Sequence, residues 1–396
     1  MSRTLALAVS PGEVWAALEE DGELTGLHVA RDASRDVVGA VYLGRVVALR
    51  PELPAALVDI GLDRPAFLDA RDADREKGIA GLTEGATLLV EVIKATRADK
   101  AAGVRVLPAD DARRAAFAQA ARAVQPPARL DAPEPAILAA AKPLLTPPPD
   151  RILIDERGAL AELRRADPRL AERLAFHGEA TPLFDALGIA DAIEAVLQPR
   201  VALPGGGTIV VEPTHAATLI DVDGGARKPL DANLAAAVAI ARQIRLRNLA
   251  GPIVIDFVGM TKREDRDKVA AALTAALAED REKRDFLGWT KLGHFELVRR
   301  RGAPAVTELF SEPSPEGGWR KTGLTLALAA LRAVDREAQA RPGKSFALAV
   351  HPDIAAALDD GAGLAARQWL EARLGRRLAV TAEPNRARDA VDIRAE

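Results

Sequence analysis

Aspartates late in two apolar segments are the residues whose types and spacing best suit chemistry. Asp221 lies in TLIDVD, Asp256 lies in IVIDFV, and Asp223 follows Asp221 by two residues. An ionised carboxylate in such a place is costly unless a cation pairs with it. Asp221 and Asp256 could hold Mg²⁺, or Mn²⁺ in its place, because these hard ions take oxygen ligands and suit phosphate substrates. Asp223 could add a ligand or orient a bound water.

Spacing alone leaves a second interpretation of these aspartates open. Aspartates at strand ends commonly cap turns through hydrogen bonds to backbone N–H groups. Short Asp-x-Asp patterns also arise by chance. On this pattern, the three residues are either metal ligands or turn caps.

The stretch 281–302 is a candidate nucleic-acid surface. It carries seven basic side chains against three acidic ones. Its aromatic residues are Phe286, Trp289 and Phe295. Lys291 and the run from Arg299 to Arg301 could contact a phosphate backbone while the rings stack on bases. The alternative is a solvated face whose aromatic rings belong to the core.

The elements that would position the aspartates form a βαβ unit. Residues 208–213 and 218–223 predict two strands, a helix follows from Asp231 to Arg247, and residues 252–258 predict another apolar strand. Strands joined by one crossover helix lie parallel and end on the same edge of a sheet, where open α/β sheets bind ligands. Asp221 and Asp256 should therefore converge. Three arginines of the helix would add positive charge near them: Arg242, Arg245 and Arg247.

The remaining chain divides into further regions. Short Val- and Leu-rich segments between residues 37 and 107 are typical of a small β-barrel. Tyr42 and Phe67 are its only aromatic residues, and with Lys100 they would suit single-stranded nucleic acid unless the rings pack in the core. The proline-rich residues 108–149 predict a linker with short helices.

Composition narrows the function classes. The chain has 396 residues and no cysteine, which excludes disulfides, cysteine-held zinc, iron–sulfur clusters and thiol catalysis. Four of the five histidines lack partners at diagnostic spacing and predict structural roles: His177, His215, His294 and His351. The net charge of −3 neither indicates nor excludes a nucleic-acid partner. No apolar run reaches the roughly 20 residues of a membrane span, so we expect a cytoplasmic protein without a membrane partner.

Taken together, these segments resemble the ribonuclease E/G family of bacterial endoribonucleases. The similarity is strongest in LPGGGTIVVEPTHAATLIDVD and DANLAAAVAIARQIRLRNLAGPIVIDFVGM, and it continues to KLGHFELVRRR. The segment VYLGRVVALRPELPAALVDIGLDRPAFL resembles the S1 domain of that family, an OB-type RNA-binding fold.

The resemblance implies an Mg²⁺-dependent endonuclease that cleaves single-stranded RNA to 5′-phosphate and 3′-hydroxyl ends. Asp221 and Asp256 match the two aspartates that hold the metal in the family. Phe67 and Lys100 match positions that contact RNA, whereas Leu57 replaces the other stacking aromatic residue.

Three further departures bear on activity. Asp223 stands where the family usually has asparagine, which affects rate and metal preference. The 5′-monophosphate sensor of the family has no counterpart in residues 108–149, so preference for that 5′ end should not transfer. SEPSPEGGWRKTG replaces the CPxC zinc motif that links subunits, so there is no zinc, and a homodimer would form without a zinc link.

The resemblance implies a multidomain α/β fold. The expected parts are an RNase H-like scaffold (1–35 and 150–208), an inserted S1 barrel (36–107), the linker (108–149), a DNase I-like catalytic domain (209–310) and a small C-terminal α/β domain (311–396). The expected function is a metal-dependent endoribonuclease whose RNA contacts are Phe67, Lys100, Tyr42, Lys291 and Arg299. One alternative is a non-catalytic RNA-binding or ribosome-maturation factor on the same fold. A small-molecule phosphohydrolase also fits the carboxylates but leaves the S1 domain without a role.

Overall fold

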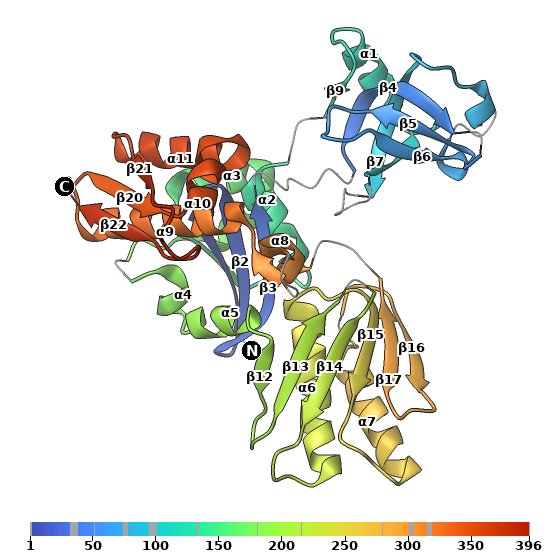
Figure 1. Ribbon diagram of the computed structural model, residues 1–396, viewed down its shortest axis with the longest axis vertical. Helices are drawn as coiled ribbons and strands as arrows, with labels where there is room; N and C mark the ends of the chain where they lie inside the picture. The colour runs from blue at the N-terminus through green and yellow to red at the C-terminus, as the bar shows by residue number, and fades with distance from the viewer. Residues whose placement is uncertain are drawn as a thin grey trace. The chain divides into compact units, whose positions relative to one another are not determined.

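The chain divides into two compact units, one of residues 1–33 and 135–396 and one of residues 34–134 (Figure 1). The computed structural model describes all residues except 1, 32–38, 51, 74–77, 95–100, 132–133, 180, 215, 279, 301–304, 315–318 and 396. No helix in the described ranges is long and apolar enough to cross a membrane.

The larger unit contains a mixed five-stranded sheet. In order across the sheet its strands are β11 (Leu174–Phe176), β10 (Arg151–Ile154), β1 (Arg3–Ser10), β2 (Glu13–Glu20) and β3 (Glu23–Arg31). β1, β10 and β11 are parallel, whereas β1, β2 and β3 are antiparallel neighbours. Strands from residues 3–31 and from residues 151–176 therefore form one sheet.

Helices bury both faces of this first sheet. On one face, α2 (Ala136–Ala141) and α3 (Arg157–Ala166) pack against Leu5 and Leu7 of β1. On the other face, α5 (Ala190–Val196) and α8 (Val306–Phe310) pack against Trp15 of β2. α4 (Leu183–Ala186) precedes α5. Burial on both sides explains the unbroken apolar run from Val14 to Leu18 in β2.

A second, six-stranded sheet carries the aspartates. In order its strands are β12 (Arg200–Ala202), β13 (Thr208–Pro213), β14 (Thr218–Asp223), β15 (Gly251–Asp256), β17 (Phe295–Arg299) and β16 (Arg284–Trp289). α6 (Pro229–Leu246) and α7 (Arg263–Ala276) lie side by side on one face (Figure 1). In β14, alternation buries Ile220 and Val222 under these helices and leaves Asp221 exposed on the opposite face.

A third, smaller sheet ends the larger unit. Its order is β21 (Ala379–Ala382), β20 (Phe346–Val350) and β22 (Asp392–Ala395). It shares an apolar core with α9 (Gly323–Ala340), α10 (Pro352–Asp359) and α11 (Gly361–Leu374). A short hairpin of β18 (Ser311–Pro313) and β19 (Trp319–Lys321) precedes this region. These elements lie within residues 311–396, for which a small α/β domain was expected, and that domain boundary stays a prediction.

The smaller unit is a closed five-stranded barrel, which fits an OB-type domain. Its strands are β4 (Val41–Arg50), β5 (Ala55–Asp59), β6 (Ala66–Asp69), β8 (Gly103–Val106) and β7 (Thr87–Lys94), and β4 closes the barrel by pairing with both β5 and β7. β9 (Ala128–Arg129) adds to β4, and α1 (Arg114–Ala121) lies between β8 and β9.

The structure corrects three expected boundaries. Residues 108–149 are not one linker, because β9 completes the barrel unit and α2 belongs to the core of the first sheet. The second sheet begins at Arg200 rather than at residue 209, and α6 begins at Pro229 rather than at Asp231. β16 was not predicted.

Candidate active site

Asp221 and Asp256 lie directly opposite each other on neighbouring parallel strands. β14 and β15 are parallel, and their register pairs Asp221 with Asp256 at the carboxyl ends. Residues in register on adjacent strands project from the same face of a sheet. Both side chains are exposed. The two carboxylates therefore lie together at one edge of the sheet, as the βαβ pattern predicted. Their role as metal ligands stays a prediction.

The donor set fits Mg²⁺. In the described part of the chain, no three His, Cys, Asp or Glu side chains gather closely enough to hold a metal by themselves. Mg²⁺ does not need such a cage, because it keeps several waters and is usually held by one or two carboxylates together with substrate phosphates. Two exposed carboxylates on one sheet edge meet that requirement and leave room for a phosphate.

Asp223 makes a turn-capping contact. Its Oδ1 accepts a hydrogen bond from the N–H of Gly225 at 2.9 Å, so one of its two oxygens serves the turn after β14. This turn is tightly packed against the preceding glycine turn, because a Cβ on Gly207 would lie 2.5 Å from the Asp223 carbonyl oxygen. Gly207 also has a φ of +90°, which favours glycine.

Asn233 connects helix α6 to the loop that follows Asp256. The buried amide donates from Nδ2 to the Val258 carbonyl at 2.7 Å and accepts from the Val258 N–H at 3.0 Å through Oδ1. These two bonds fix the backbone two residues beyond Asp256. Gly224 permits the close approach, because a Cβ there would lie 3.0 Å from Ala232 and 3.2 Å from Val258. Asn233 was within a quoted motif but was not singled out.

His294 lies beside Asp256, so the expectation that it is isolated is wrong. Its Nε2 is 3.8 Å from Asp256 Oδ1. Ile255 pairs with Phe295 in the antiparallel ladder. Asp256 follows Ile255 and His294 precedes Phe295, so these two residues come to lie opposite each other. Lys291 is exposed in the turn before β17. It therefore stays a candidate RNA contact at the edge that carries the aspartates.

Arg299 has a structural role, which corrects its prediction as an RNA contact. Its guanidinium forms a two-pronged ion pair with Asp280, at 2.7 and 2.9 Å, and Nη1 donates to Asn248 Oδ1 and to the Leu249 carbonyl. The side chain is 5% exposed. Arg299 also pairs with Gly251 at the start of β15, the edge of the sheet opposite Asp256. Arg301 lies outside the described residues.

The arginines of α6 are also far from the aspartates along the sheet. The helix runs antiparallel to the strands it connects, so its last turns lie at the amino ends of those strands. Arg242 donates to the Leu24 carbonyl of the first sheet, and buried Arg247 donates to Gln243 Oε1 and to the Gln198 carbonyl. Burial lowers the pKa of Arg247 to about 10. Arg242 thus joins α6 to the first sheet, Arg247 joins the end of α6 to the segment before β12, and neither adds charge near the aspartates.

The aromatic residues of 281–302 belong to the core, as the alternative interpretation described. Phe295 is 2% exposed. The Trp289 ring lies 5.3 Å from the Phe295 ring and 5.6 Å from the Phe257 ring, measured between centroids. Stacking of RNA bases on this stretch therefore has no support from the structure.

On the barrel, Phe67 and Leu57 are direct cross-strand neighbours. Both are half-buried, and Phe67 is also in register with Gly103, which pairs with the exposed Lys94. An aromatic ring (Phe67), an aliphatic side chain (Leu57) and a cation (Lys94) therefore lie on adjacent strands at the barrel surface. Regular alternation would have placed Lys94 on the core face with Val90 and Val92, and only the bulge between Val92 and Lys94 turns it outward.

Tyr42 and Lys100 have different outcomes. Tyr42 is 6% exposed in the barrel core, with Arg129 over its ring at 6.0 Å, and burial raises its pKa. Its prediction as an RNA contact is therefore wrong in this conformation. Lys100 lies outside the described residues, as does His215.

Comparisons with known proteins agree on one family. Residues 111–302 match the family model described as the Ribonuclease E/G family. Ribonuclease G of Haemophilus influenzae is 27% identical over an alignment of 475 positions that covers 96% of each chain, and Ribonuclease G of Escherichia coli is 27% identical with 99% of each chain covered. Ribonuclease E of Nostoc is 41% identical over 150 residues, which are 36% of this chain and 22% of that protein. The alignment of 475 positions exceeds the 396 residues here, so the Haemophilus protein has segments that this chain lacks.

Proposed function

The chain belongs to the ribonuclease E/G family, and from this premise we propose that it is an Mg²⁺-dependent endoribonuclease of RNA processing or decay. It cleaves single-stranded RNA to 5′-phosphate and 3′-hydroxyl ends. The observation that carries the proposal is the register of Asp221 with Asp256 at the carboxyl ends of parallel strands.

Asp221 and Asp256 would hold the metal in this proposal. When bound, Mg²⁺ or Mn²⁺ would supply an activated water and neutralise charge that develops on the scissile phosphate. The carboxylates themselves are exposed on an open sheet face, so an RNA strand can approach them without displacing protein.

Neighbouring side chains keep this edge in place. Asn233 fixes the loop after Asp256 through its two bonds to Val258, and Asp223 braces the turn after β14. Neither contact uses Asp221 or Asp256. Preorganised groups of this kind contribute to catalysis because they need not rearrange during the reaction.

RNA would be bound by surfaces of both units. Lys291 would attract the phosphate backbone near the aspartates, while Phe67 would stack on a base and Lys94 would pair with a phosphate on the barrel. Leu57 covers the neighbouring position without an aromatic ring, so base stacking on the barrel is weaker than with two rings.

The finer predictions from sequence belong to the same proposal. Cleavage does not depend on a 5′-monophosphate, and no zinc is needed. A homodimer without a zinc link and a cytoplasmic location complete the proposal.

The test is cleavage of a labelled A/U-rich single-stranded RNA in Mg²⁺, with 5′-monophosphate and 5′-hydroxyl versions side by side. The proposal expects similar rates for both versions, and products that carry 5′-phosphate and 3′-hydroxyl ends. RNA binding without cleavage in Mg²⁺ and in Mn²⁺ would favour the alternative, a non-catalytic RNA-binding or ribosome-maturation factor. The turn contact of Asp223 and the aliphatic Leu57 are the observations on the side of that alternative.

A further inference from the structure

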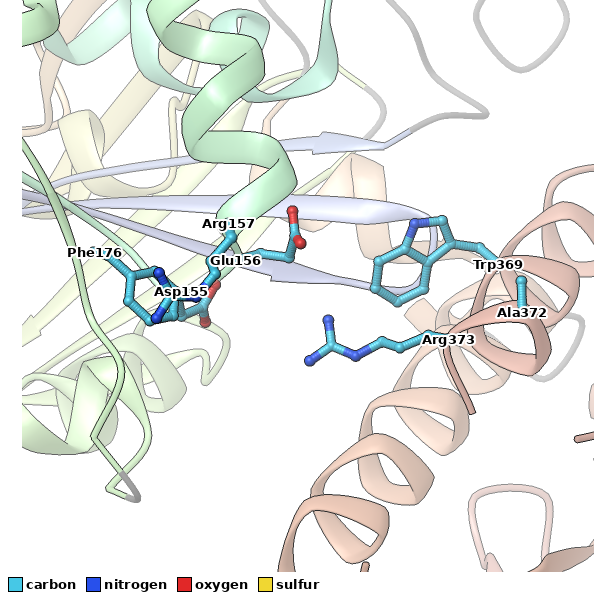
Figure 2. A pocket seen from close by; sticks show the side chains of 7 residues that line it. All are labelled: Asp155, Glu156, Arg157, Phe176, Trp369, Ala372 and Arg373. Carbon is cyan, nitrogen blue, oxygen red and sulfur yellow. The ribbon is translucent and has the colours of Figure 1, made fainter. Parts of the chain in front are cut away.

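A cavity of about 530 Å³ opens in the larger unit between the first sheet and helix α11. Figure 2 shows Asp155, Glu156, Arg157 and Phe176 on one side and Trp369 and Arg373 on the other. None of these residues belongs to the second sheet, which carries Asp221 and Asp256. The cavity is therefore separate from the candidate active site.

The cavity lies at the place where α/β sheets commonly bind ligands. Asp155 and Glu156 directly follow β10, and Phe176 is the last residue of β11. β1, β10 and β11 are parallel, so these residues stand at the carboxyl ends of parallel strands. Crevices outside such ends, and at the junction of two structural layers, are preferred ligand sites.

Flat surfaces line both sides. Trp369 is 38% exposed, and the Arg373 guanidinium lies 5.4 Å from its ring centroid. Opposite, the Arg157 guanidinium lies 3.9 Å from the Phe176 ring centroid. Aromatic rings and guanidinium planes are the surfaces on which nucleobases stack. A planar aromatic ligand thus suits the cavity.

The cavity also supplies carboxylate acceptors. Asp155 accepts the Val9 N–H at 2.8 Å, and in Figure 2 Arg373 extends across the cavity toward it. Glu156 caps α3 by accepting from the N–H groups of Gly158 and Ala159. Since Glu156 already occupies these amides, the helix N-terminus is not open to a phosphate. Hydrogen-bond donors on the edge of a ring match the cavity better than an anion does.

Both walls are fixed before any ligand binds. α11 packs closely on the turn between β1 and β2, because a Cβ on Gly12 would lie 2.8 Å from the Ala366 Cβ. On the opposite wall, a Cβ on Gly178 would lie 2.6 Å from the Phe176 ring. Arg373 is further held by Asp335 at 3.4 Å. A preformed site avoids the entropic cost of ordering its walls on binding.

We propose that this cavity binds a nucleobase, which stacks on Trp369 while Asp155 and Glu156 accept hydrogen bonds from its exocyclic amino group. Adenine, cytosine and guanine carry such an amino group, whereas uracil has a carbonyl oxygen in its place and only the N3–H between its two carbonyls as a donor. The cavity therefore selects amino-bearing bases over uracil. The base comes either from an RNA strand or from a free nucleotide, and the chemistry of recognition is the same.

The first test is calorimetric titration with AMP, CMP, GMP, UMP and ribose 5-phosphate at pH 8, where Asp155 is ionised. The probes are added to the full chain carrying Asp221→Asn and Asp256→Asn, so that binding does not depend on RNA cleavage. We expect the three amino-bearing nucleotides to bind more tightly than UMP, and ribose 5-phosphate to bind much more weakly than AMP. Equal binding of ribose 5-phosphate and AMP would identify an anion site and overturn the proposal.

Variants connect that binding to the cavity. Trp369→Ala should weaken AMP binding about tenfold or more through loss of stacking, whereas Trp369→Phe keeps a ring and should retain most of it. Trp319→Phe, at an exposed tryptophan of β19, serves as the matched control and should change nothing. AMP affinity that is unchanged in Trp369→Ala would contradict the proposal.

Asp155→Asn tests whether Asp155 accepts a hydrogen bond from the amino group of the base. The amide oxygen can still accept the Val9 N–H, while the new NH₂ group donates to carbonyls, so the preference should shift from AMP toward UMP. An unchanged order of affinities would sink this assignment. Oligo(A) and oligo(U) in the same variants separate the two sources. Sensitivity of oligo(A) binding to Trp369→Ala identifies an RNA base, sensitivity of AMP alone identifies a free nucleotide, and sensitivity of neither rejects the site.

Discussion

The pKa values of Asp280 and Asp155, two carboxylates largely shielded from water, shift in opposite directions. Burial alone would raise the pKa of Asp280, but the paired guanidinium of Arg299 outweighs burial and holds that pKa below its usual range. For Asp155, burial raises the pKa from 3.8 to about 6, and its backbone hydrogen bond offsets only part of this. The first carboxylate thus stabilises the fold at neutral pH, and the second destabilises it there.

Replacing Arg299 should destabilise the fold without identifying an RNA contact. Arg299→Leu leaves Asp280 buried and unpaired, which should cost about 3–5 kcal/mol in the free energy of unfolding. The matched variant Lys291→Ala should leave the free energy of unfolding unchanged and weaken RNA binding. The slope of the logarithm of RNA affinity against the logarithm of salt concentration should become shallower by about 1. Chemical denaturation and RNA titrations at several salt concentrations measure both. A stable Arg299→Leu protein with reduced RNA affinity would contradict the assignment of Arg299.

Asp155 predicts a stability change with pH. A carboxyl group whose folded pKa is raised stabilises the protein below its unfolded pKa, and this contribution is lost as pH rises through the folded pKa. The wild type should therefore lose stability relative to Asp155→Asn between pH 3.8 and about 6, and the difference should be constant above that. Urea denaturation of both proteins from pH 4 to 8 measures it. A difference that is flat over the whole range would show that Asp155 is not buried as described.

At this scale the sequence predicted some residues and not others. Asp221 and Asp256 were predictable because one crossover helix between two apolar strands determines their relative placement. His294 was not, because its contact with Asp256 depends on a strand that returns antiparallel after another helix. Arg299 was misassigned since charge counts cannot distinguish a buried ion pair from a solvated cation.

At the scale of elements, the contact between α6 and the loop after β15 positions the aspartates. Asn233 satisfies both backbone groups of Val258 at a fully buried position. The apolar patterns of β14 and β15 were enough to predict these two strands, whereas β16 could not be predicted in this way. β16 has a bulge between Phe286 and Gly288, which interrupts the alternation by which strands are recognised.

Removing this contact should reduce both stability and activity. Asn233→Ala leaves the Val258 N–H and carbonyl buried without partners, at a cost of about 1–3 kcal/mol for each group. The RNA cleavage rate should fall because the loop after Asp256 is no longer fixed. Val238→Ala, at an exposed position of the same helix, should change the free energy of unfolding by less than about 0.5 kcal/mol. Full activity in Asn233→Ala would mean that this loop does not position Asp256.

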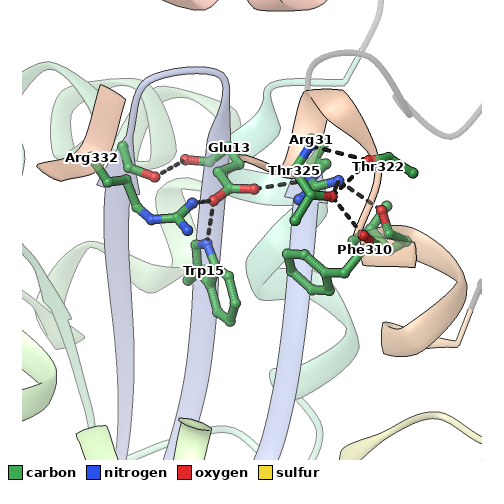
Figure 3. Close-up of polar contacts among 9 residues, drawn as sticks. Glu13, Trp15, Arg31, Phe310, Thr322, Thr325 and Arg332 are labelled. Carbon is green, nitrogen blue, oxygen red and sulfur yellow. Dashed lines mark hydrogen bonds and ion pairs between the residues drawn. The ribbon is translucent and has the colours of Figure 1, made fainter. Parts of the chain in front are cut away.

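At the scale of the larger unit, a buried ionic network joins the first sheet to helix α9. Glu13 accepts hydrogen bonds from Arg31 at 2.9 Å and from the Trp15 indole at 2.8 Å, and it also pairs with Arg332 of α9 (Figure 3). Arg31 in turn donates to Thr325 at the start of α9. The C-terminal elements and the first sheet therefore depend on each other.

Glu13→Ala should destabilise the larger unit severely. The change leaves the buried guanidinium of Arg31 and the half-buried one of Arg332 with less compensation, at a cost of about 3–5 kcal/mol. Glu23 forms an ion pair with Arg242, and its side chain is 69% exposed. Glu23→Ala should therefore lower the free energy of unfolding by less than about 1 kcal/mol. Thermal denaturation compares the two. Equal melting temperatures would contradict the role of this network.

The sequence could not predict all contacts between distant segments of the chain. Glu13 and Arg332 are more than 300 positions apart, and no local pattern pairs them. The barrel boundary was misplaced for a similar reason, since β9 joins β4 only after a helix and several prolines. The discontinuous first sheet was inferred through the family resemblance rather than through periodicity.

The central claim is that the facing pair Asp221 and Asp256 forms the active site. The most direct measurement is the cleavage rate of labelled single-stranded RNA in Mg²⁺ by the wild type, Asp221→Asn, Asp256→Asn and the control Asp285→Asn, an exposed carboxylate of β16. All four should fold alike, since these carboxylates are exposed. We expect either aspartate variant to lose at least about a hundredfold in rate, on the scale of a lost electrostatic catalytic group, and Asp285→Asn to cleave as the wild type does. Cleavage at the wild-type rate by a folded Asp221→Asn or Asp256→Asn protein would contradict the claim.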